Sequence, residues 1–131
     1  MNAFLDPDRR LAIAHRGGAL RRPENTMAAF DYAVGLGVDA IELDVRLSRD
    51  GEAMVIHDPT VDRTTDGAGS MAERTLADLR TFDAGYRFTR DDGRTYPWRG
   101  KGIRIPTLDE VLESFPDTPC LIEIKALEAT E

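Results

Sequence analysis

The chain has 131 residues, of which 41% are hydrophobic and 31% are charged, a composition ordinary for one soluble globular domain. No apolar run approaches the ~20 residues that a membrane-spanning helix needs, so no span is predicted. The net charge of −7 argues against nucleic acid as a partner, because duplex binding depends on basic side chains that neutralise phosphates. An acidic protein that binds a phosphate ligand needs a local source of positive charge, such as a cation, placed Arg or Lys side chains, or backbone N–H groups at a helix start.

The cysteine content and the first residues bear on the cellular compartment. Cys120 has no second cysteine with which to form an intrachain disulfide, which is typical of a reducing compartment. Charged residues within 1–10 precede any apolar stretch, so we expect no secretory signal there. These features predict a cytoplasmic protein.

The first part of the chain predicts a strand, a helix and two further strands. A short apolar run at 11–14 ends in the glycine-rich turn 15–18. A helix then begins, for which Asn25 is the expected cap, and its apolar residues recur at helical spacing until Gly35 and Gly37 end it. The two strands are expected at 38–47 and 53–56, with Asp50-Gly51 as the turn between them.

The rest of the chain predicts a long insertion, a helix and a fourth strand. The insertion at about 59–105 is expected to hold one short helix near Thr75, and its length favours a functional segment or a small subdomain. Thr107 and Glu110 form a capping box for the next helix. The apolar stripe of that helix is Leu108, Val111, Leu112 and Phe115. With a fourth strand at 120–125, this order of elements indicates an α/β fold with a mainly parallel sheet.

The second strand carries charged residues on one face. Glu42, Asp44 and Arg46 share a face because side chains alternate along a strand. Both faces of a parallel sheet are normally covered, and two covered carboxylates would cost several kcal/mol without compensation, about 2–7 kcal/mol for a polar group alone. A divalent cation would supply that compensation. The alternative is an edge strand with a solvated acidic face.

The fourth strand repeats this pattern with Glu123 and Lys125 on one face. A third carboxylate from this strand would complete an all-oxygen site suited to Mg²⁺ or Ca²⁺ rather than zinc. The alternative is a simple Glu–Lys pair on the surface.

Both histidines of the chain, His15 and His57, directly follow an apolar strand. The carboxyl ends of strands are where active sites of α/β folds are assembled, and histidine can exchange a proton near neutral pH. A structural role is the alternative for each. The planar guanidinium of Arg16 suits phosphate oxygens or a site carboxylate. Four aromatic residues of the insertion could line a substrate pocket or pack the insertion onto the barrel: Tyr86, Phe88, Tyr96 and Trp98.

Taken in order, these motifs resemble the glycerophosphodiester phosphodiesterase family. The resemblance covers about residues 11 to 126, and the ordered set is far more specific than any one motif. The matching segments are His15-Arg16-Gly17-Gly18, Pro23-Glu24-Asn25-Thr26, Ile41-Glu42-Leu43-Asp44-Val45, Asp50-Gly51, His57-Asp58, Arg63-Thr64-Thr65, Ile105-Pro106-Thr107-Leu108 and Ile122-Glu123-Ile124-Lys125.

The resemblance implies a TIM-barrel hydrolase that splits glycerophosphodiesters into an alcohol and glycerol 3-phosphate. It assigns the divalent cation, Mg²⁺ or Ca²⁺, to Glu42, Asp44 and Glu123. It makes His15 and His57 the acid–base pair, without assigning which is which, and places Arg16 and Lys125 on the substrate phosphate. The family is thought to use the glycerol hydroxyl as an internal nucleophile, giving a cyclic phosphate that water then opens.

The length departs from the family pattern, because a (β/α)8 barrel needs eight strands and roughly 250 residues. We therefore expect the first half of such a barrel, about four strands, of the phospholipase C-like phosphodiesterase type. Such a chain would be a truncated product, or would pair with the missing barrel half or with itself. The competing functional hypothesis is an inactive half-barrel that only binds a metal or a partner. A third is a related barrel phosphodiesterase acting on inositol lipids or sphingomyelin, which the ordered motifs suit less well.

Overall fold

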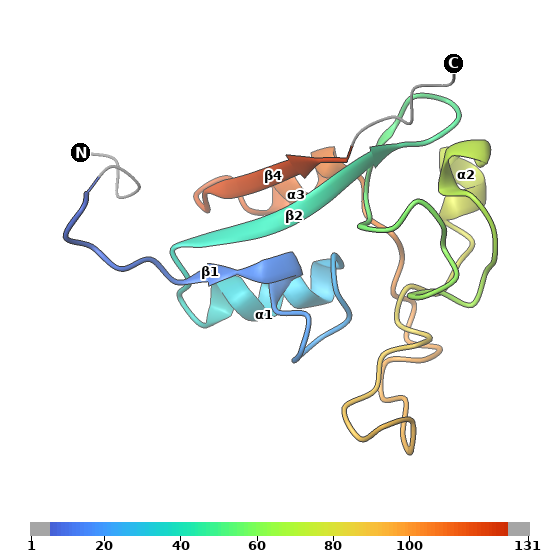
Figure 1. Cartoon of the computed structure of the whole chain (residues 1–131), viewed down its shortest axis with the longest axis horizontal. Coiled ribbons are helices and arrows are strands. Elements are labelled where there is room, and N and C mark those ends of the chain that lie inside the picture. Colours follow the sequence, from blue (N-terminus) through green and yellow to red (C-terminus); the bar gives the residue numbers. More distant parts are fainter. Residues whose placement is uncertain (1–5, 126–131) are drawn as a thin grey trace.

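The sheet is built around one central strand in the computed structural model, which describes residues 6–125. Within those residues the strands are β1 (Ile13–Ala14), β2 (Ala40–Leu47), β3 (Ala53–Val55) and β4 (Cys120–Ile124), shown in Figure 1. β1 and β4 pair in parallel with opposite edges of β2, since Ile41 is paired with Ala14 on one side and with Cys120 on the other. The sheet is therefore mainly parallel, as predicted.

β3 is antiparallel to the carboxyl end of β2, and it lies on the same edge of β2 as β1. The turn between β2 and β3 is tight: the Ser48 hydroxyl donates to Asp50, and Gly51 takes a φ of 81° that suits glycine. So short a connection can only return the chain as a hairpin, because a parallel crossover needs a dozen or more residues. Of the four expected strands, three (β1, β2 and β4) thus run in the parallel barrel direction.

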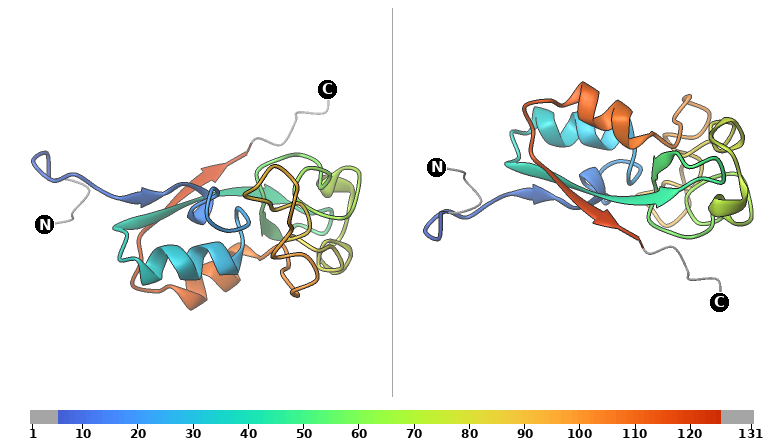
Figure 2. Two further views of the ribbon diagram at one scale, coloured as in Figure 1. Left: turned by 90° about the horizontal axis from the view of Figure 1, so that it is seen from below. Right: turned by 90° about the horizontal axis from the view of Figure 1, so that it is seen from above.

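Two helices cover one face of the sheet. α1 (Met27–Gly35) and α3 (Leu108–Ser114) lie side by side on that face in both views of Figure 2. They bury the odd-numbered residues of β2, and burial of such side chains contributes about 1.5–3 kcal/mol each. The buried members of this core are Phe30, Ala33, Ile41, Leu43, Val45, Val55, Val111 and Phe115. The predicted stripe of α3 is only partly right, since Leu112 is 40% exposed.

The helix caps differ in one place from the prediction. Thr107 and Glu110 form the expected capping box. α1, however, is capped by Thr26, whose hydroxyl accepts from the Ala29 N–H, so the prediction of an Asn25 cap is wrong. Asn25 has a φ of 53°, and its side chain turns toward the sheet instead. None of the helices within residues 6–125 has the length and apolarity needed to cross a bilayer.

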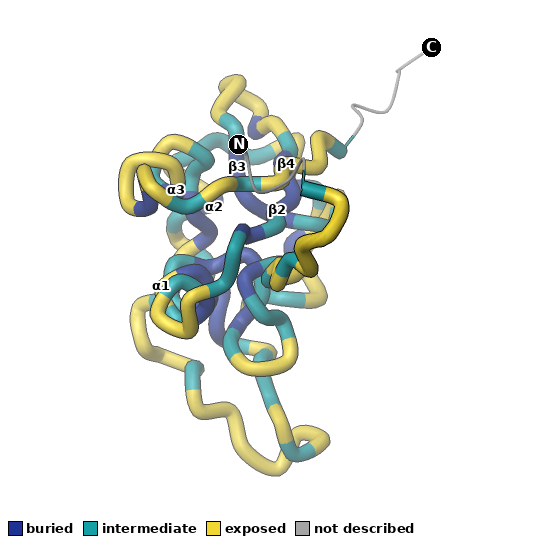
Figure 3. Tube along the Cα trace, turned by 90° about the vertical axis from the view of Figure 1, so that its left-hand side faces the viewer, coloured by how far each residue is buried: buried dark blue, intermediate teal, exposed yellow. Residues whose placement is uncertain are grey.

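The segment from residue 56 to 106 gathers beyond the carboxyl ends of β2 and β4 (Figure 1) and packs a second core. It contains the 3-10 turn η3 (Met71–Glu73) and the helix α2 (Leu76–Leu79), which begins near Thr75 as expected. Thr75 forms a capping box with Asp78. The buried members of this core are Met54, Ile56, Val61, Met71, Leu79, Ala84 and Ile105. Figure 3 shows buried positions clustered where strands and helices meet, with long exposed stretches of loop outside them. β3 joins the two cores, because Val55 faces one and Met54 the other.

Candidate functional site

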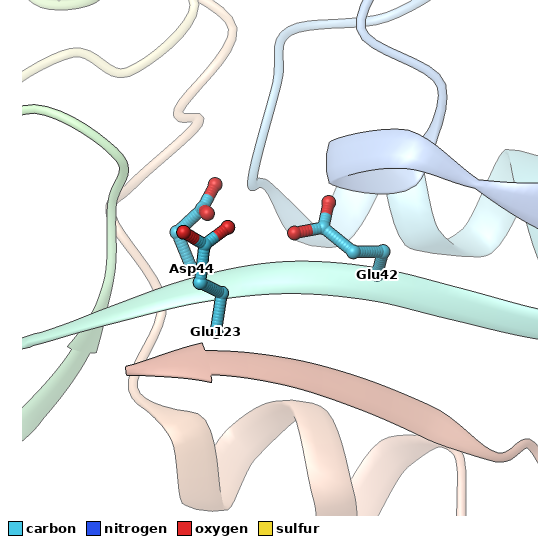
Figure 4. A group of neighbouring side chains, drawn as sticks. All are labelled: Glu42, Asp44 and Glu123. Atoms are coloured by element: carbon cyan, nitrogen blue, oxygen red, sulfur yellow. The ribbon is translucent and has the colours of Figure 1, made fainter. Parts of the chain in front are cut away.

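Three carboxylates converge on the sheet face opposite the helices. The register of β2 and β4 pairs Asp44 with Glu123, and Glu42 lies two residues before Asp44 on the same face. One carboxylate oxygen from each lies within 4.8 Å of the others, and Figure 4 shows all three side chains on one side of the strands. Asp44 is buried, with 1% exposure, whereas Glu123 is exposed. The structure thus brings together the three acids that the sequence singled out.

Two positively charged side chains lie against these carboxylates. The Lys125 Nζ is 2.6 Å from a Glu123 oxygen and 3.7 Å from Asp44 Oδ1. The Lys125 hydrogen bond holds the pKa of Glu123 below its usual value although burial opposes it, and the nearby His57 imidazole adds in the same direction. The same hydrogen bond raises the pKa of Lys125. Arg16 reaches Asp44 from the other side, with its Nε 3.4 Å from Asp44 Oδ2.

The turn after β1 aims Arg16 at the site. Arg16 has a φ of 50°, within the 3-10 turn η2 (His15–Gly17), and its backbone N–H donates to Glu42. Gly17 allows this turn to pack on α1, since a Cβ there would lie 2.7 Å from the Phe30 ring. Among the described residues, the Arg16 Nε is the buried side-chain polar atom without a hydrogen-bond partner. Charge attraction to Asp44 at 3.4 Å is its compensation.

Asn25 is a site residue that the sequence interpretation missed. Its Nδ2 donates to Asp44 Oδ2 at 3.0 Å, and its Oδ1 accepts the Asp44 N–H at 3.4 Å. The amide therefore fixes the orientation of the buried carboxylate from both ends. The available signal was Thr26, a competent cap at the next position that leaves Asn25 free for another role.

The two histidines differ in their surroundings. His15 is 70% exposed, and its Nε2 lies 3.9 Å from Glu42 Oε2. His57 follows β3 and is only part-buried; its Nδ1 lies 2.7 Å from Asp58 Oδ1. The His57 carbonyl oxygen accepts from Arg46 Nε at 2.7 Å, so Arg46 holds the loop that carries this histidine.

Arg63 joins two loops that border the site. It donates to both carboxylate oxygens of Glu24 at 2.9 and 2.6 Å and to both oxygens of Asp58 at 2.8 and 3.1 Å. The Arg63 hydrogen bond lowers the pKa of Asp58 to about 2, against the effect of burial and with help from His57. Burial raises the pKa of Glu24, but Arg63 and Arg16 outweigh it, so the net pKa is lowered. The sequence interpretation gave Glu24, Asp58 and Arg63 no role.

A cavity of about 390 Å³ opens beside Glu24 and Arg63. Of the four aromatic residues considered from the sequence, Phe88 lines this cavity. Tyr86 and Tyr96 instead stack on the guanidinium of Arg99, each 3.9 Å from ring centre to Cζ. Trp98 lies against Gly85, and its ring centre is 5.5 Å from the Arg22 Cζ, which belongs to the segment before α1. Tyr86 and Tyr96 therefore pack within the insertion, whereas Trp98 also contacts the segment before α1.

The arrangement suits a hard divalent cation. All three candidate ligands offer carboxylate oxygen, which is the donor that Mg²⁺ and Ca²⁺ prefer. Three carboxylates against Arg16 and Lys125 leave one net negative charge in this innermost group, which would repel a phosphate anion. A divalent cation would reverse that sign and make the group attractive to phosphate oxygens.

A family comparison places the chain among known proteins. The model of the glycerophosphoryl diester phosphodiesterase family matches residues 15–131. A protein named glycerophosphodiester phosphodiesterase from Caldanaerobacter subterraneus subsp. tengcongensis is 49% identical over 115 residues, 88% of this chain and 44% of the relative. One of the same name from Bacillus subtilis is 42% identical over 86% of this chain and 38% of the relative. The chain thus spans under half the length of these relatives.

Solved structures agree in fold. The glycerophosphoryl diester phosphodiesterase domain of an uncharacterized Mycobacterium tuberculosis protein superimposes with a TM-score of 0.84 at 33% identity, covering 89% of this chain and 44% of that one. A phosphodiesterase from Oleispira antarctica, solved in complex with the product sn-glycerol-3-phosphate, gives a TM-score of 0.77 at 35% identity. It covers 91% of this chain and 46% of that one. The parallel sheet with helices on one face thus matches part of a TIM barrel, as expected from the sequence.

Proposed function

Because the chain belongs to the glycerophosphoryl diester phosphodiesterase family, we propose that it carries the metal-binding and acid–base part of a hydrolase that cleaves glycerophosphodiesters to an alcohol and glycerol 3-phosphate. The single observation that supports this most is the convergence of Glu42, Asp44 and Glu123 on one sheet face. Two positively charged side chains, those of Arg16 and Lys125, and two histidines surround that face. The substrate class comes from the family and from the relatives' names.

In this proposal Glu42, Asp44 and Glu123 hold Mg²⁺ or Ca²⁺. An ion held there would supply positive charge to stabilise the negative charge that grows on the phosphoryl oxygens. Asn25 keeps the Asp44 carboxylate oriented, since it bonds both the side chain and the N–H of that residue. Without a bound cation, the negative charge of these carboxylates would destabilise the fold, because Asp44 is buried.

Arg16 and Lys125 bind the substrate phosphate in this proposal, and His15 and His57 move the protons. The two cations already flank the carboxylates, so they can hold a phosphate next to the bound ion. One imidazole accepts the proton of the attacking hydroxyl, and the other donates a proton to the leaving oxygen. The attacking hydroxyl is that of the substrate glycerol, and water then opens the resulting cyclic phosphate.

The domain organisation and setting are part of the same proposal. The whole chain is one partial barrel domain with an insertion at about 59–105, and a small glycerophosphodiester is its partner. The lone Cys120 favours the cytoplasm. The missing barrel half, or a second copy of the chain, would complete the pocket, which is supported by the half-length match to relatives.

The test is to incubate the protein with glycerophosphocholine and Mg²⁺ or Ca²⁺ and to assay glycerol 3-phosphate. We expect product formation that EDTA abolishes and that added cation restores. D44N should lower the rate by at least about 10²-fold, the usual size of an electrostatic contribution of this kind. The matched control is E113Q, which removes one exposed carboxylate of α3 and should leave the rate unchanged. Product formation that survives both EDTA and D44N would contradict the metal role.

The alternative is that the 131-residue chain, which spans under half the length of these relatives, binds a metal or a partner without catalysis. Titration calorimetry with Mg²⁺ or Ca²⁺ separates the two hypotheses. Cation binding that D44N abolishes, together with no glycerol 3-phosphate, would support the inactive fragment. Cation binding together with product would support the hydrolase.

A further inference from the structure

His57 is held at two points by groups outside the carboxylate cluster. Arg46 fixes its backbone through the carbonyl oxygen at 2.7 Å. Asp58 contacts its imidazole, with Oδ1 2.7 Å from Nδ1. An ionised carboxylate can only accept a hydrogen bond, so the ring nitrogen that faces it must carry the proton. The contact therefore selects one of the two neutral tautomers of His57.

Asp58 is itself immobilised. Arg63 donates to both of its oxygens and uses its remaining N–H groups on both oxygens of Glu24. Glu24 also accepts from Arg16 at 3.2 Å, so the chain of contacts ends at the cation that lies against Asp44. Two carboxylates accept four hydrogen bonds from Arg63, two each, which is the geometry in which arginine gives most directional control.

The chain of contacts crosses between loops that are far apart in sequence. Glu24 precedes α1, whereas Asp58 and Arg63 follow β3, and Arg63 and Glu24 are separated by 39 positions. Glu24 and Asp58 are largely shielded from solvent, with 15% and 23% of the side chain exposed, whereas Arg63 is 48% exposed and is held by its hydrogen bonds to both carboxylates. Its position couples the loop of Arg16 to the loop of His57.

We propose that Asp58 is a positioning residue that holds His57 as the tautomer protonated at Nδ1, which leaves Nε2 to exchange the proton, while Arg63 and Glu24 keep Asp58 in place. The inference rests on the proposed function only for the task of Nε2. An unrestrained neutral imidazole carries its proton mainly on Nε2, so the proposed tautomer is the less common one. In serine proteases an aspartate that orients a histidine in this way has a large effect on rate.

The test is long-range ¹H–¹⁵N NMR of the ¹⁵N-labelled protein, at a pH high enough for both imidazoles to be neutral. The chain has two histidines, so the spectrum is simple to assign. We expect His57 to show a protonated Nδ1 and an unprotonated Nε2. His15, which is 70% exposed, is the internal control and should show the opposite, ordinary preference. A wild-type His57 with its proton mainly on Nε2 overturns the proposal, whatever any variant does.

Variants then assign the effect. D58A should return His57 to the ordinary Nε2-protonated form, and R63Q should lower the Nδ1-protonated fraction several-fold. The matched controls are D31A, on the exposed face of α1, and R94Q, in an exposed loop, neither of which should change the tautomer. Circular dichroism checks that each variant is folded. If D58A is folded and the Nδ1 proton persists, Asp58 is not the positioning residue.

The tautomer measurement needs neither substrate nor metal, so its outcome is independent of the product assay. The expected tautomer in a protein that forms no glycerol 3-phosphate would leave the positioning role standing and count against the hydrolase. Product formation together with the ordinary tautomer would overturn the positioning role and support the hydrolase. In a protein that forms product, D58A should lower kcat with little change in KM, because Asp58 acts through His57 and not on the bound substrate.

Discussion

Asp44 is the residue at which most contacts of the candidate site meet. Asn25, Arg16 and Lys125 all approach its carboxylate, and Glu42 and Glu123 lie on either side. At 1% exposure, a carboxylate needs this many partners because an unpaired buried charge is strongly destabilising. A position that combines burial with like-charged neighbours is therefore more readily explained by cation binding than by fold stability alone.

Gly17 gives a prediction about the turn that carries His15 and Arg16. G17A should lower the free energy of unfolding by about 2–4 kcal/mol, because a Cβ would strain a backbone at φ 76° and press on the Phe30 ring. G18A is the matched control, since Gly18 also has a positive φ but nothing lies within 4 Å of its Cβ position. We expect G18A to lower the free energy of unfolding, measured by urea denaturation, by only about 1 kcal/mol. Equal losses in the two variants would show that the contact with Phe30 is unimportant.

The pKa of Asp58 gives a prediction about acid stability. Because Arg63 lowers this pKa from 3.8 to about 2, the ionised form stabilises the fold fully above about pH 4. That contribution, about 1 kcal/mol after solvent screening, is lost as the pH falls from 4 to 2. Urea unfolding at pH 5 and pH 2 should therefore show a stability gap between wild type and D58N that narrows at the lower pH. D92N, at an exposed position, should show no such gap.

At the level of elements, His15, Arg16 and Lys125 directly follow strands of the same direction. β1 leads into His15 and Arg16, and β4 leads into Lys125. β3 is antiparallel: it begins beside the end of β2 and runs back along β2, so it lies at the same end of the sheet. The Val55 N–H donates to the Pro106 carbonyl, so the chain that returns from the insertion closes beside β3. The start of α3 is thereby fixed next to the loop of His57.

The cap of α3 gives a prediction at this scale. T107A should lower the free energy of unfolding by about 1 kcal/mol, because it removes the capping hydroxyl. The Thr107 hydroxyl accepts a hydrogen bond from the Glu110 N–H, and the Glu110 carboxylate accepts one from the Thr107 N–H. Val111 of this helix and Phe115, which follows it, belong to the core, so unfolding of the helix would also disturb packing against the sheet. S114A, at an exposed position in the same helix, is the control for urea unfolding. A loss in S114A as large as in T107A would argue against a capping effect.

At the level of the whole molecule, the outer side of β4 is the open feature. Within residues 6–125 no strand pairs with that edge, and its apolar residues are exposed, Ile124 most of all at 80%. Ile122, on the same face as Ile124, and Leu121, on the opposite face, are also exposed, at 40% and 42%. An unpaired strand edge with exposed apolar side chains is a template for pairing with another chain. The half-length match to relatives fits this picture, since TIM barrels continue with further strands there.

We therefore predict that a polypeptide of these 131 residues alone self-associates with rising concentration, as measured by sedimentation velocity. I124K should weaken that association, because a charge on an edge strand opposes pairing. L36K is the matched control, since Leu36 is also exposed but lies at the end of α1, away from the edge. A wild-type protein that stays monomeric over the whole concentration range would contradict the prediction.

The sequence by itself determined the elements, the cap of α3 and the charged face of β2, because alternation, helical spacing and capping depend on residues close together in the chain. The ordered motifs were enough to indicate the family and the half-barrel. Only the tertiary structure decided the pairing of Asp44 with Glu123, the turn of Asn25 toward the site and the link from Arg63 to Glu24. These contacts join residues 19 to 79 positions apart, and their partners depend on strand register and loop packing, which no local pattern specifies.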